Sequence, residues 1–217
     1  MDLETTQQGR ILKIGAVLGD KQFLRAGQFD LPSSLLDLDR FAANAVCVIG
    51  HNLLQHDLAI LAEKNSALAL LRLPVIDTLF LSPICFPENP YHRLIKDYKL
   101  VSESLNDPVA DARLAGSLFE DEVRSLRGMA QAAPDMFRCL RFLLGQTGGA
   151  EPRITKGLKR VFLAADGPDM PTNEEVRTLI RGFLGQMACR RGAEFFSETD
   201  FSTDEARWAL MALLPAV

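Results

Sequence analysis

The chain has 217 residues and a formal net charge of −4, with 47% hydrophobic and 24% charged residues. This length accommodates one generous domain, or one domain with a smaller annex, and the composition is ordinary for a folded protein. The net negative charge argues against a protein that binds nucleic acid over its whole surface.

The apolar runs and the cysteines indicate the cellular setting. No apolar run approaches the roughly 20 residues of a membrane-spanning helix, and the first residues lack the pattern of a signal peptide. The four cysteines are widely spaced and form no Cys-x-x-Cys pair. We therefore expect buried reduced thiols in a cytoplasmic protein, rather than a zinc site or a disulfide framework.

The first predicted elements are a hairpin and a helix. Residues 10–18 read as a strand and residues 22–29 as its partner, joined around Gly19-Asp20. Ser33 or Ser34 can cap a helix that continues to about residue 45.

Two further strands enclose a second helix. The apolar run 45–49 before Gly50 suits a buried parallel strand, residues 53–65 a helix, and residues 74–78 another short strand. With a first strand ending at Glu4, the order is β-β-β-α-β-α-β. Because so little of that first strand is present, we expect that residues upstream of it are missing from this sequence.

From Asp107 onward the pattern is helical. Asp107-Pro108 combines an Asp cap with proline at the first helical position, and predicts a helix to about residue 126. A linker is expected over 145–152, and Thr172 or Asn173 should cap one of the later helices. These later helices are predicted over residues 134–144, 155–164, 173–190 and 203–214.

Carboxylates and neighbouring polar residues indicate where the chemistry lies. Asp2 and Glu4 are two residues apart on a strand, so they point to the same face and repel each other unless a cation lies between them. His51 and Asn52 follow an apolar strand, at the sheet edge where open α/β proteins bind ligands. Asp57 lies in the first turns of the next helix and could lean toward the same edge.

The combination resembles the DEDD superfamily, which includes the proofreading exonucleases of DNA polymerases and 3′-to-5′ trimming enzymes. The resemblance covers roughly residues 1 to 127. It rests on the DLETT start, the His51-Asn52 pair followed by Asp57, Asp77-Thr78 ending a strand, and the Asp111-Ala112 pair one turn into a helix.

The resemblance implies an α/β fold of the ribonuclease-H-like kind, with a mixed five-stranded sheet flanked by helices over residues 1–127. A C-terminal helical extension would occupy residues 128–217. Two Mg²⁺ or Mn²⁺ ions would activate a water and stabilise the leaving oxygen at a single-stranded 3′ end of DNA or RNA. The implied metal ligands are Asp2, Glu4, Asp57 and Asp111, and the implied substrate-binding residues are Thr5, His51 and Asn52.

The sequence departs from the family pattern just before the last aspartate. The two main subgroups carry a histidine five residues before it or a tyrosine four residues before it, where this chain has Asn106 and Asp107. Asparagine cannot accept a proton at neutral pH but can orient a water, so Asn106 joins Glu4 as a predicted catalytic residue. Helix capping is the simpler role for Asp107.

The histidines leave alternatives open. His51 suits either substrate contact or a structural role, and His56 either packs or reaches toward a metal-bound carboxylate. His92 lies in the basic segment 90–100, which suits phosphate contact or a solvated surface equally. That segment also resembles exonuclease domains that accompany bacterial helicases, which predicts a helicase domain or partner.

Two hypotheses follow. The first is a metal-dependent 3′-to-5′ exonuclease, favoured by the four carboxylates. The second is a catalytically weakened module of the same fold that binds nucleic acid within a larger helicase-linked protein, favoured by Asn106.

Overall fold

The computed structural model describes residues 1–89, 107–145, 152–167, 169 and 171–184. The chain divides into two compact units, Met1–Glu122 and Val123–Val217. The boundary falls within the longest described helix, α4 (Pro108–Ala132). Each unit is described by itself.

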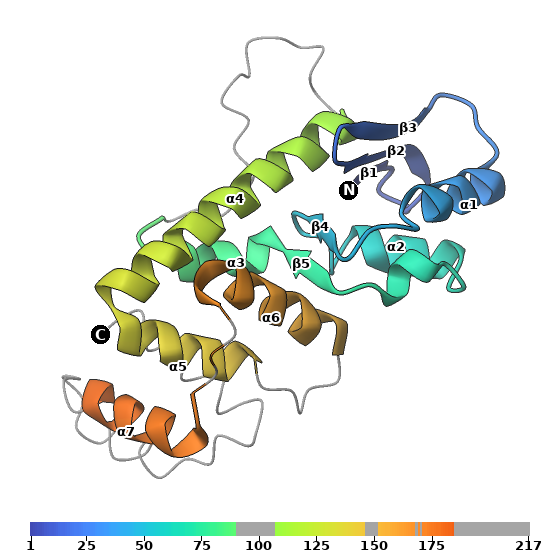
Figure 1. Ribbon diagram of the computed structural model, residues 1–217. Helices are drawn as coiled ribbons and strands as arrows, with labels where there is room; N and C mark the ends of the chain where they lie inside the picture. Colours follow the sequence, from blue (N-terminus) through green and yellow to red (C-terminus); the bar gives the residue numbers. More distant parts are fainter. Residues whose placement is uncertain (90–106, 146–151, 168, 170, 185–217) are drawn as a thin grey trace. The chain divides into compact units, whose positions relative to one another are not determined.

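The first unit contains the strands (Figure 1). The strands β1 (Asp2–Thr5), β2 (Ile11–Leu18) and β3 (Lys21–Ala26) form an antiparallel sheet in that order, and β4 (Val48–Gly50) pairs in parallel with β5 (Val75–Asp77). The expected single sheet of five strands is therefore wrong, because the described strands form one sheet of three and one of two.

The short first strand explains why the two sheets stay separate. In β1, Asp2 is the first residue in register with β2, opposite Gly15. The amino group of Met1 donates a hydrogen bond to the carbonyl of Ile49 at 2.6 Å, so the start of β1 reaches β4 at one backbone position. One such bond is too little to make a ladder between the sheets.

The predicted hairpin is confirmed. Leu18 pairs with Lys21 across the two-residue turn Gly19-Asp20. Gly19 has a φ of 58°, a left-handed conformation that costs glycine little and matches the twist of a two-residue hairpin.

Helix α1 (Leu31–Phe41) is capped by a residue other than the two predicted serines. The carboxylate of Asp30 accepts a hydrogen bond from the Ser33 amide at 2.9 Å, and Pro32 lies in the first turn. The predicted cap at Ser33 or Ser34 was wrong because Asp30 already satisfies the first amides of the helix.

Helix α2 (Asp57–Lys64) begins four residues later than predicted. The amides of Asn52 and Leu54 donate to the side chain of Asp77 at 2.9 Å, and Asn52 has a φ of 61°. Backbone held in this way cannot form the first helical turn. Two elements were not predicted, the short 3₁₀ helix η1 (Ala69–Arg72) and the helix α3 (Thr78–Cys85), which contains Pro83.

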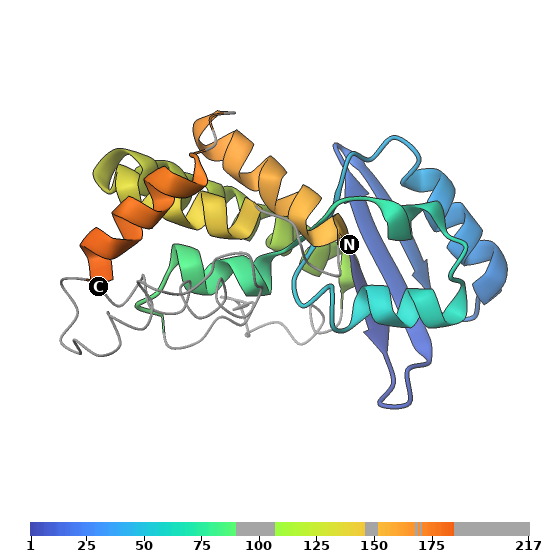
Figure 2. The same cartoon turned by 90° about the horizontal axis from the view of Figure 1, so that it is seen from below.

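Helices lie on both sides of the antiparallel sheet. In Figure 2, α1 and α2 lie on one side of β1 to β3 and the first turns of α4 on the other. The side facing α1 and α2 forms a hydrophobic core that includes the fully buried Ile14, Leu38 and Leu61. None of the described helices is both long enough and apolar enough to cross a membrane.

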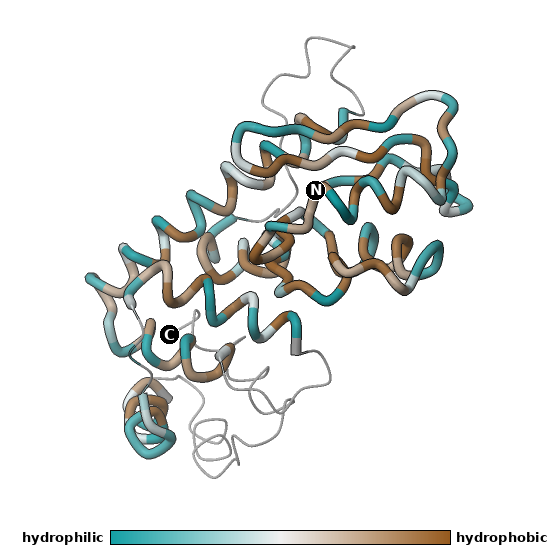
Figure 3. The backbone as a smooth tube through the Cα atoms, turned by 45° about the vertical axis from the view of Figure 1, so that its right-hand side comes forward, coloured by the Kyte–Doolittle hydropathy of each residue, from teal (hydrophilic) through white to brown (hydrophobic). Residues whose placement is uncertain are grey.

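The second unit is helical in its described residues, with α5 (Pro134–Gly145), α6 (Pro152–Asp166) and α7 (Asn173–Leu184). Its helices alternate between hydrophilic and hydrophobic residues along the backbone (Figure 3). Phe137 and Phe162 pack edge to face with ring centroids 5.6 Å apart. Thr172 and Glu175 exchange hydrogen bonds at the start of α7, which confirms a cap at Thr172. The predicted helix over 203–214 lies outside the described residues.

Two of the three described cysteines agree with the expectation of buried thiols. Cys85 and Cys139 are buried, and Cys47 is half-buried. Burial raises the pKa of both buried thiols, that of Cys139 to about 12, which keeps the unreactive protonated form.

Candidate metal centre

Strand β1 presents its acidic residues on one face and its apolar residue on the other. Leu3 is 4% exposed and belongs to the core beneath the sheet. Because side chains alternate along a strand, Asp2 and Glu4 on either side of it point to the opposite face, toward α4. Their shared direction, predicted from the spacing, is confirmed.

A close backbone contact brings α4 to that face. A Cβ atom built on Gly15 would lie 2.3 Å from the carbonyl carbon of Pro108 and 2.5 Å from the amide nitrogen of Val109. Only glycine allows such an approach between strand and helix. Since Gly15 is the register partner of Asp2, the first turn of α4 lies directly beside Asp2.

The start of α4 is fixed by two further contacts. The carboxylate of Asp107 accepts hydrogen bonds from the amides of Val109 and Ala110 at 3.0 and 3.3 Å, which confirms its predicted capping role. Arg113 donates to the side chain of Gln22 on β3 at 3.0 Å. The helix is thereby held in one rotational position on the sheet, with Asp111 facing β1.

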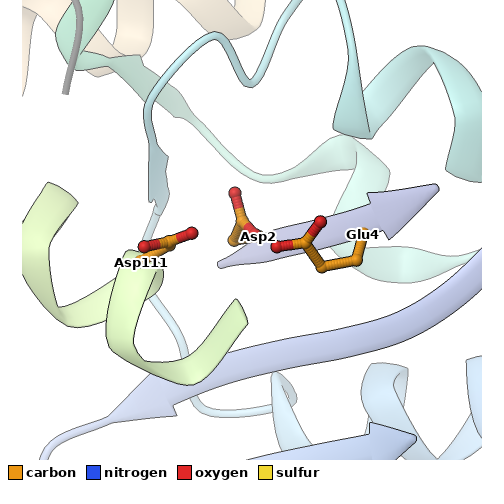
Figure 4. Close-up of side chains that lie close together, drawn as sticks. All are labelled: Asp2, Glu4 and Asp111. Carbon is orange, nitrogen blue, oxygen red and sulfur yellow. The ribbon is translucent and has the colours of Figure 1, made fainter. Parts of the chain in front are cut away.

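The result is a cluster of three carboxylates, Asp2, Glu4 and Asp111. One oxygen of each lies within 4.8 Å of the others, and all three residues are half-buried. Figure 4 shows Asp2 between Glu4 and Asp111, with the carboxyl groups turned toward one another. Negative groups at this separation repel unless a cation lies among them, and carboxylate oxygens are the donors that Mg²⁺ and Mn²⁺ prefer. The donor set therefore fits a hard divalent ion.

Asp57, the fourth predicted ligand, is not a member of this cluster. It is 2% exposed, and its carboxylate accepts a hydrogen bond from the amide of Leu3 at 2.6 Å. Burial, with the nearby charge of Asp2 as a second cause, raises the pKa of Asp57 to about 8. Asp57 thus ties α2 to the middle of β1, immediately behind the two acidic residues of that strand.

The predicted substrate-binding residues lie at the end of β1 and in the loop after β4. The hydroxyl of Thr5 is 3.4 Å from Nε2 of His56, so His56 contacts β1 on the residue next to Glu4. His51 lies with Nδ1 2.9 Å from the hydroxyl of Thr78. Asn52 has a left-handed backbone conformation, and its amide donates a hydrogen bond to the carboxylate of Asp77. The predicted catalytic Asn106, together with His92 and the basic segment 90–100, lies outside the described residues.

Asp77 has a role that the sequence analysis missed. It is 5% exposed, and its two oxygens accept hydrogen bonds from the amides of Asn52, Leu54 and Leu79. It caps α3 and shapes the loop after β4 at the same time. An aspartate followed by threonine after a short apolar strand is an N-cap pattern that could have revealed the helix.

Glu122 is a second buried acid without a predicted role. It is fully buried, and neither carboxylate oxygen has a hydrogen-bond partner among the described residues. Burial raises its pKa to about 9, and the charges of Asp77 and Asp121 add to the effect. The thiol of Cys85 donates to the carbonyl of Glu122 at 3.6 Å, which joins α3 to α4.

Fold and site together define an α/β protein with a helical second unit and a half-buried carboxylate cluster between a strand and a helix start. Comparison with protein-family models, with curated proteins and with solved structures finds no match to this chain.

Proposed function

We propose that this protein is a metal-dependent 3′-to-5′ exonuclease that hydrolyses phosphodiester bonds at single-stranded nucleic-acid ends. The observation that carries the proposal is the convergence of Asp2, Glu4 and Asp111 within 4.8 Å. These are three of the four carboxylates that the resemblance to the DEDD superfamily assigns to two divalent ions. The resemblance also supports a ribonuclease-H-like ancestry for the first unit, with a sheet that is split here between β1 and β4.

Asp2, Glu4 and Asp111 would hold the ions, which supply an activated water and neutralise charge on the leaving oxygen. Strand β1 and the first turn of α4 hold these carboxylates without needing substrate, so the site is preorganised. Asp57 keeps β1 in place through the Leu3 amide and stands beside Asp2 as the fourth acidic group.

The predicted substrate-binding residues, together with His56, suit contact with a nucleic-acid terminus. Thr5 and His56 lie on the Glu4 side of the cluster and present a hydroxyl and a ring nitrogen. His51 and Asn52 follow β4, and both belong to the loop fixed by Asp77. Hydroxyl, imidazole and amide groups bind phosphate and sugar oxygens without selecting a base, which agrees with a sequence-independent trimming enzyme.

The second candidate is a module of the same kind that binds single strands and hydrolyses them weakly. Asn106 favours it, because this residue stands where the family carries a histidine that can accept a proton. The two candidates differ in the rate at which they hydrolyse nucleic acid, and both bind single strands.

The deciding experiment incubates the full chain with a 5′-labelled single strand in Mg²⁺ or Mn²⁺. We expect stepwise shortening from the 3′ end, and a loss of rate of at least about 10²-fold in Asp111→Asn, since even partners of metal ligands typically matter 10- to 100-fold. Glu63→Gln is the matched control, because Glu63 is exposed and forms an ion pair with its neighbour Lys64. Binding without shortening in either metal would favour the second candidate.

Metal binding can be measured separately from hydrolysis, through the thermal stability of the protein. A ligand present at 100 times its Kd stabilises the folded state by about 2.7 kcal/mol, so saturating Mn²⁺ should raise Tm by several degrees. Asp111→Asn should remove most of this shift, and Glu63→Gln should keep it. An equal shift in both variants would show that the ion binds away from the carboxylate cluster.

A further inference from the structure

Helix α6 in the second unit has an apolar side and a basic side. On the apolar side, Val161 is 0% and Phe162 1% exposed. On the basic side, Lys156, Lys159 and Arg160 are exposed. Their spacing of three and four residues places these cations together, on the side of the helix opposite to Val161 and Phe162.

The requirements of the helix itself do not explain this basic side. Four of the five charged residues of α6 are cations, and the one acid, Asp166, is its last residue. Like charges three or four residues apart repel each other, and the first turn contains Arg153 and no acid, although the helix dipole favours negative charge there. None of the ion pairs formed by described residues includes Lys156, Lys159 or Arg160. A bound polyanion would relieve the repulsion among them.

Arg127 extends the row of cations at the far end of α6. Its Nε and Nη2 atoms donate hydrogen bonds to the carbonyl of Ala164 at 3.2 and 2.9 Å. The side chain is exposed, and these bonds use two of the five N–H donors of the guanidinium. Along the helix axis, Lys156 and Ala164 are about 12 Å apart at the usual helical rise. Positive charge therefore follows most of the exposed side of α6.

The partner that fits this surface is a chain of phosphates. A helix that inserts into a lipid surface needs its apolar side free, and the apolar side of α6 is buried within the protein. A partner helix would need several apolar contacts, and the exposed side of α6 offers one large apolar residue, Leu163. Lysine and arginine side chains pair with phosphate oxygens along a nucleic-acid backbone, whatever its base sequence.

We propose that the basic surface formed by Lys156, Lys159, Arg160 and Arg127 binds the sugar–phosphate backbone of single-stranded nucleic acid. The choice of nucleic acid as the polyanion rests on the proposed function. The surface itself lies wholly in the second unit and shares no residue with the carboxylate cluster. The second unit then contributes affinity for the strand, and the carboxylate cluster contributes hydrolysis.

The test measures binding of the full chain to a fluorescent oligothymidylate in EDTA, where metal-dependent hydrolysis is absent. The variant is Lys156→Gln with Lys159→Gln, because glutamine has nearly the helix propensity of lysine and the fold should persist. Each phosphate contact contributes about 0.7 to the slope of log affinity against log salt concentration, so this slope should fall by about 1.4. At about 0.1 M salt the affinity should fall at least about 10-fold. Lys156→Arg with Lys159→Arg retains the charges and should retain both the slope and the affinity.

The matched control is Lys21→Gln with Arg72→Gln, which removes the same charge from two exposed residues of the first unit. Its slope and affinity should stay close to those of the unchanged chain. Equal losses in the control and in Lys156→Gln with Lys159→Gln would show that only net charge matters, and would overturn the proposal. No binding by the unchanged chain, or an unchanged slope in the α6 variant, would overturn it too.

Two further outcomes separate this proposal from its neighbours. If the α6 variant loses binding to phosphatidylserine vesicles and keeps its oligonucleotide affinity, the surface belongs to a lipid bilayer and the proposal is overturned. If the unchanged chain never shortens a strand in Mg²⁺ or Mn²⁺, but the α6 variant shows the expected fall in slope, the basic surface is supported and the nuclease is refuted.

Discussion

Two aspartates at strand ends in the first unit, Asp77 and Asp2, have opposite surroundings. Asp77, at the end of β5, is buried and accepts hydrogen bonds from three backbone amides. Asp2, at the start of β1, is half-buried and shares its space with Glu4 and Asp111. Amides that donate to a carboxylate fix the backbone around it. Neighbouring carboxylates instead repel it, and a bound cation relieves this repulsion. The groups around the carboxylate oxygens therefore distinguish a structural aspartate from a candidate metal ligand, whereas the position at a strand end does not.

Asp57 and Glu122 lie between these extremes. Asp57 receives one amide bond and stands beside Asp2, and Glu122 has no hydrogen-bond partner for its carboxylate among the described residues. Both have a raised pKa because burial disfavours the charged form. Three substitutions of acidic residues and one of Gly15 test this comparison.

The largest effect is expected for Asp77→Ala. The substitution leaves the amides of Asn52, Leu54 and Leu79 without their acceptor, and hydrogen bonds to a charged group contribute about 1.5–3 kcal/mol each. We expect the free energy of unfolding to fall by about 4 kcal/mol, measured by urea denaturation. The control is Asp37→Ala, which breaks two exposed ion pairs and should cost less than about 1 kcal/mol. Similar losses in both variants would refute the structural role.

Gly15→Ala addresses the contact that positions the cluster. The added methyl group meets Pro108 backbone at 2.3 Å, so the start of α4 must move away from β2. Overpacking of this kind costs about 1–3 kcal/mol, and we expect the Mn²⁺-dependent rise in Tm to shrink as well. Gly128→Ala on the same helix meets nothing within 4 Å and should stabilise by about 0.5–1 kcal/mol. An unchanged metal response in Gly15→Ala would show that Asp111 is positioned in another way.

Glu122→Gln should stabilise the protein in a pH-dependent manner. The folded-state pKa of Glu122 is about 9, above its ordinary value of 4.5, so the folded state holds a proton that the unfolded state releases between these values. The stability contributed by the protonated form is complete below about pH 4.5 and is lost as pH rises toward 9. We expect the free energy of unfolding to rise by about 2 kcal/mol in the variant at pH 8 and to change little at pH 4.5. The same gain at both pH values would point to packing instead of ionisation.

The smallest effect is expected for Asp111→Asn in the presence of EDTA. Removing one charge relieves repulsion within the cluster, so the free energy of unfolding should rise by about 0.5 kcal/mol. The measurement is a urea titration without divalent ions, with Glu63→Gln as the reference. A clear loss of stability would mean that Asp111 serves the fold through contacts of its own.

Local signals predicted much of the fold. The hairpin around Gly19, the cap at Asp107 and the cap at Thr172 each depend on a few adjacent residues, and each is confirmed. Helix α3 was missed because Pro83 interrupts its pattern, although its first turn begins at an ordinary N-cap. The single five-stranded sheet was wrong because pairing between β1 and β4 depends on strand length, which hydrophobic pattern does not encode.

The candidate site was predictable in part. The spacing of Asp2 and Glu4 placed them on one face, and the resemblance added Asp111. The burial of Glu122 could not be foreseen, because it follows Glu120 and Asp121 in an apparently solvated acidic run. At this point of α4 the thiol of Cys85 on α3 donates to the Glu122 carbonyl, a contact between residues far apart in the sequence.

The contact between Gly15 and Pro108 also determines when the carboxylate cluster can exist during folding. The hairpin and the β1 pairing join residues that are close in sequence, whereas this contact closes a loop of more than ninety residues. Contacts of high sequence separation carry the larger entropic cost and tend to form late. A chain in which this contact is still open carries Asp2 and Glu4 without Asp111. Divalent-ion affinity therefore reports the completion of folding in this unit rather than its onset.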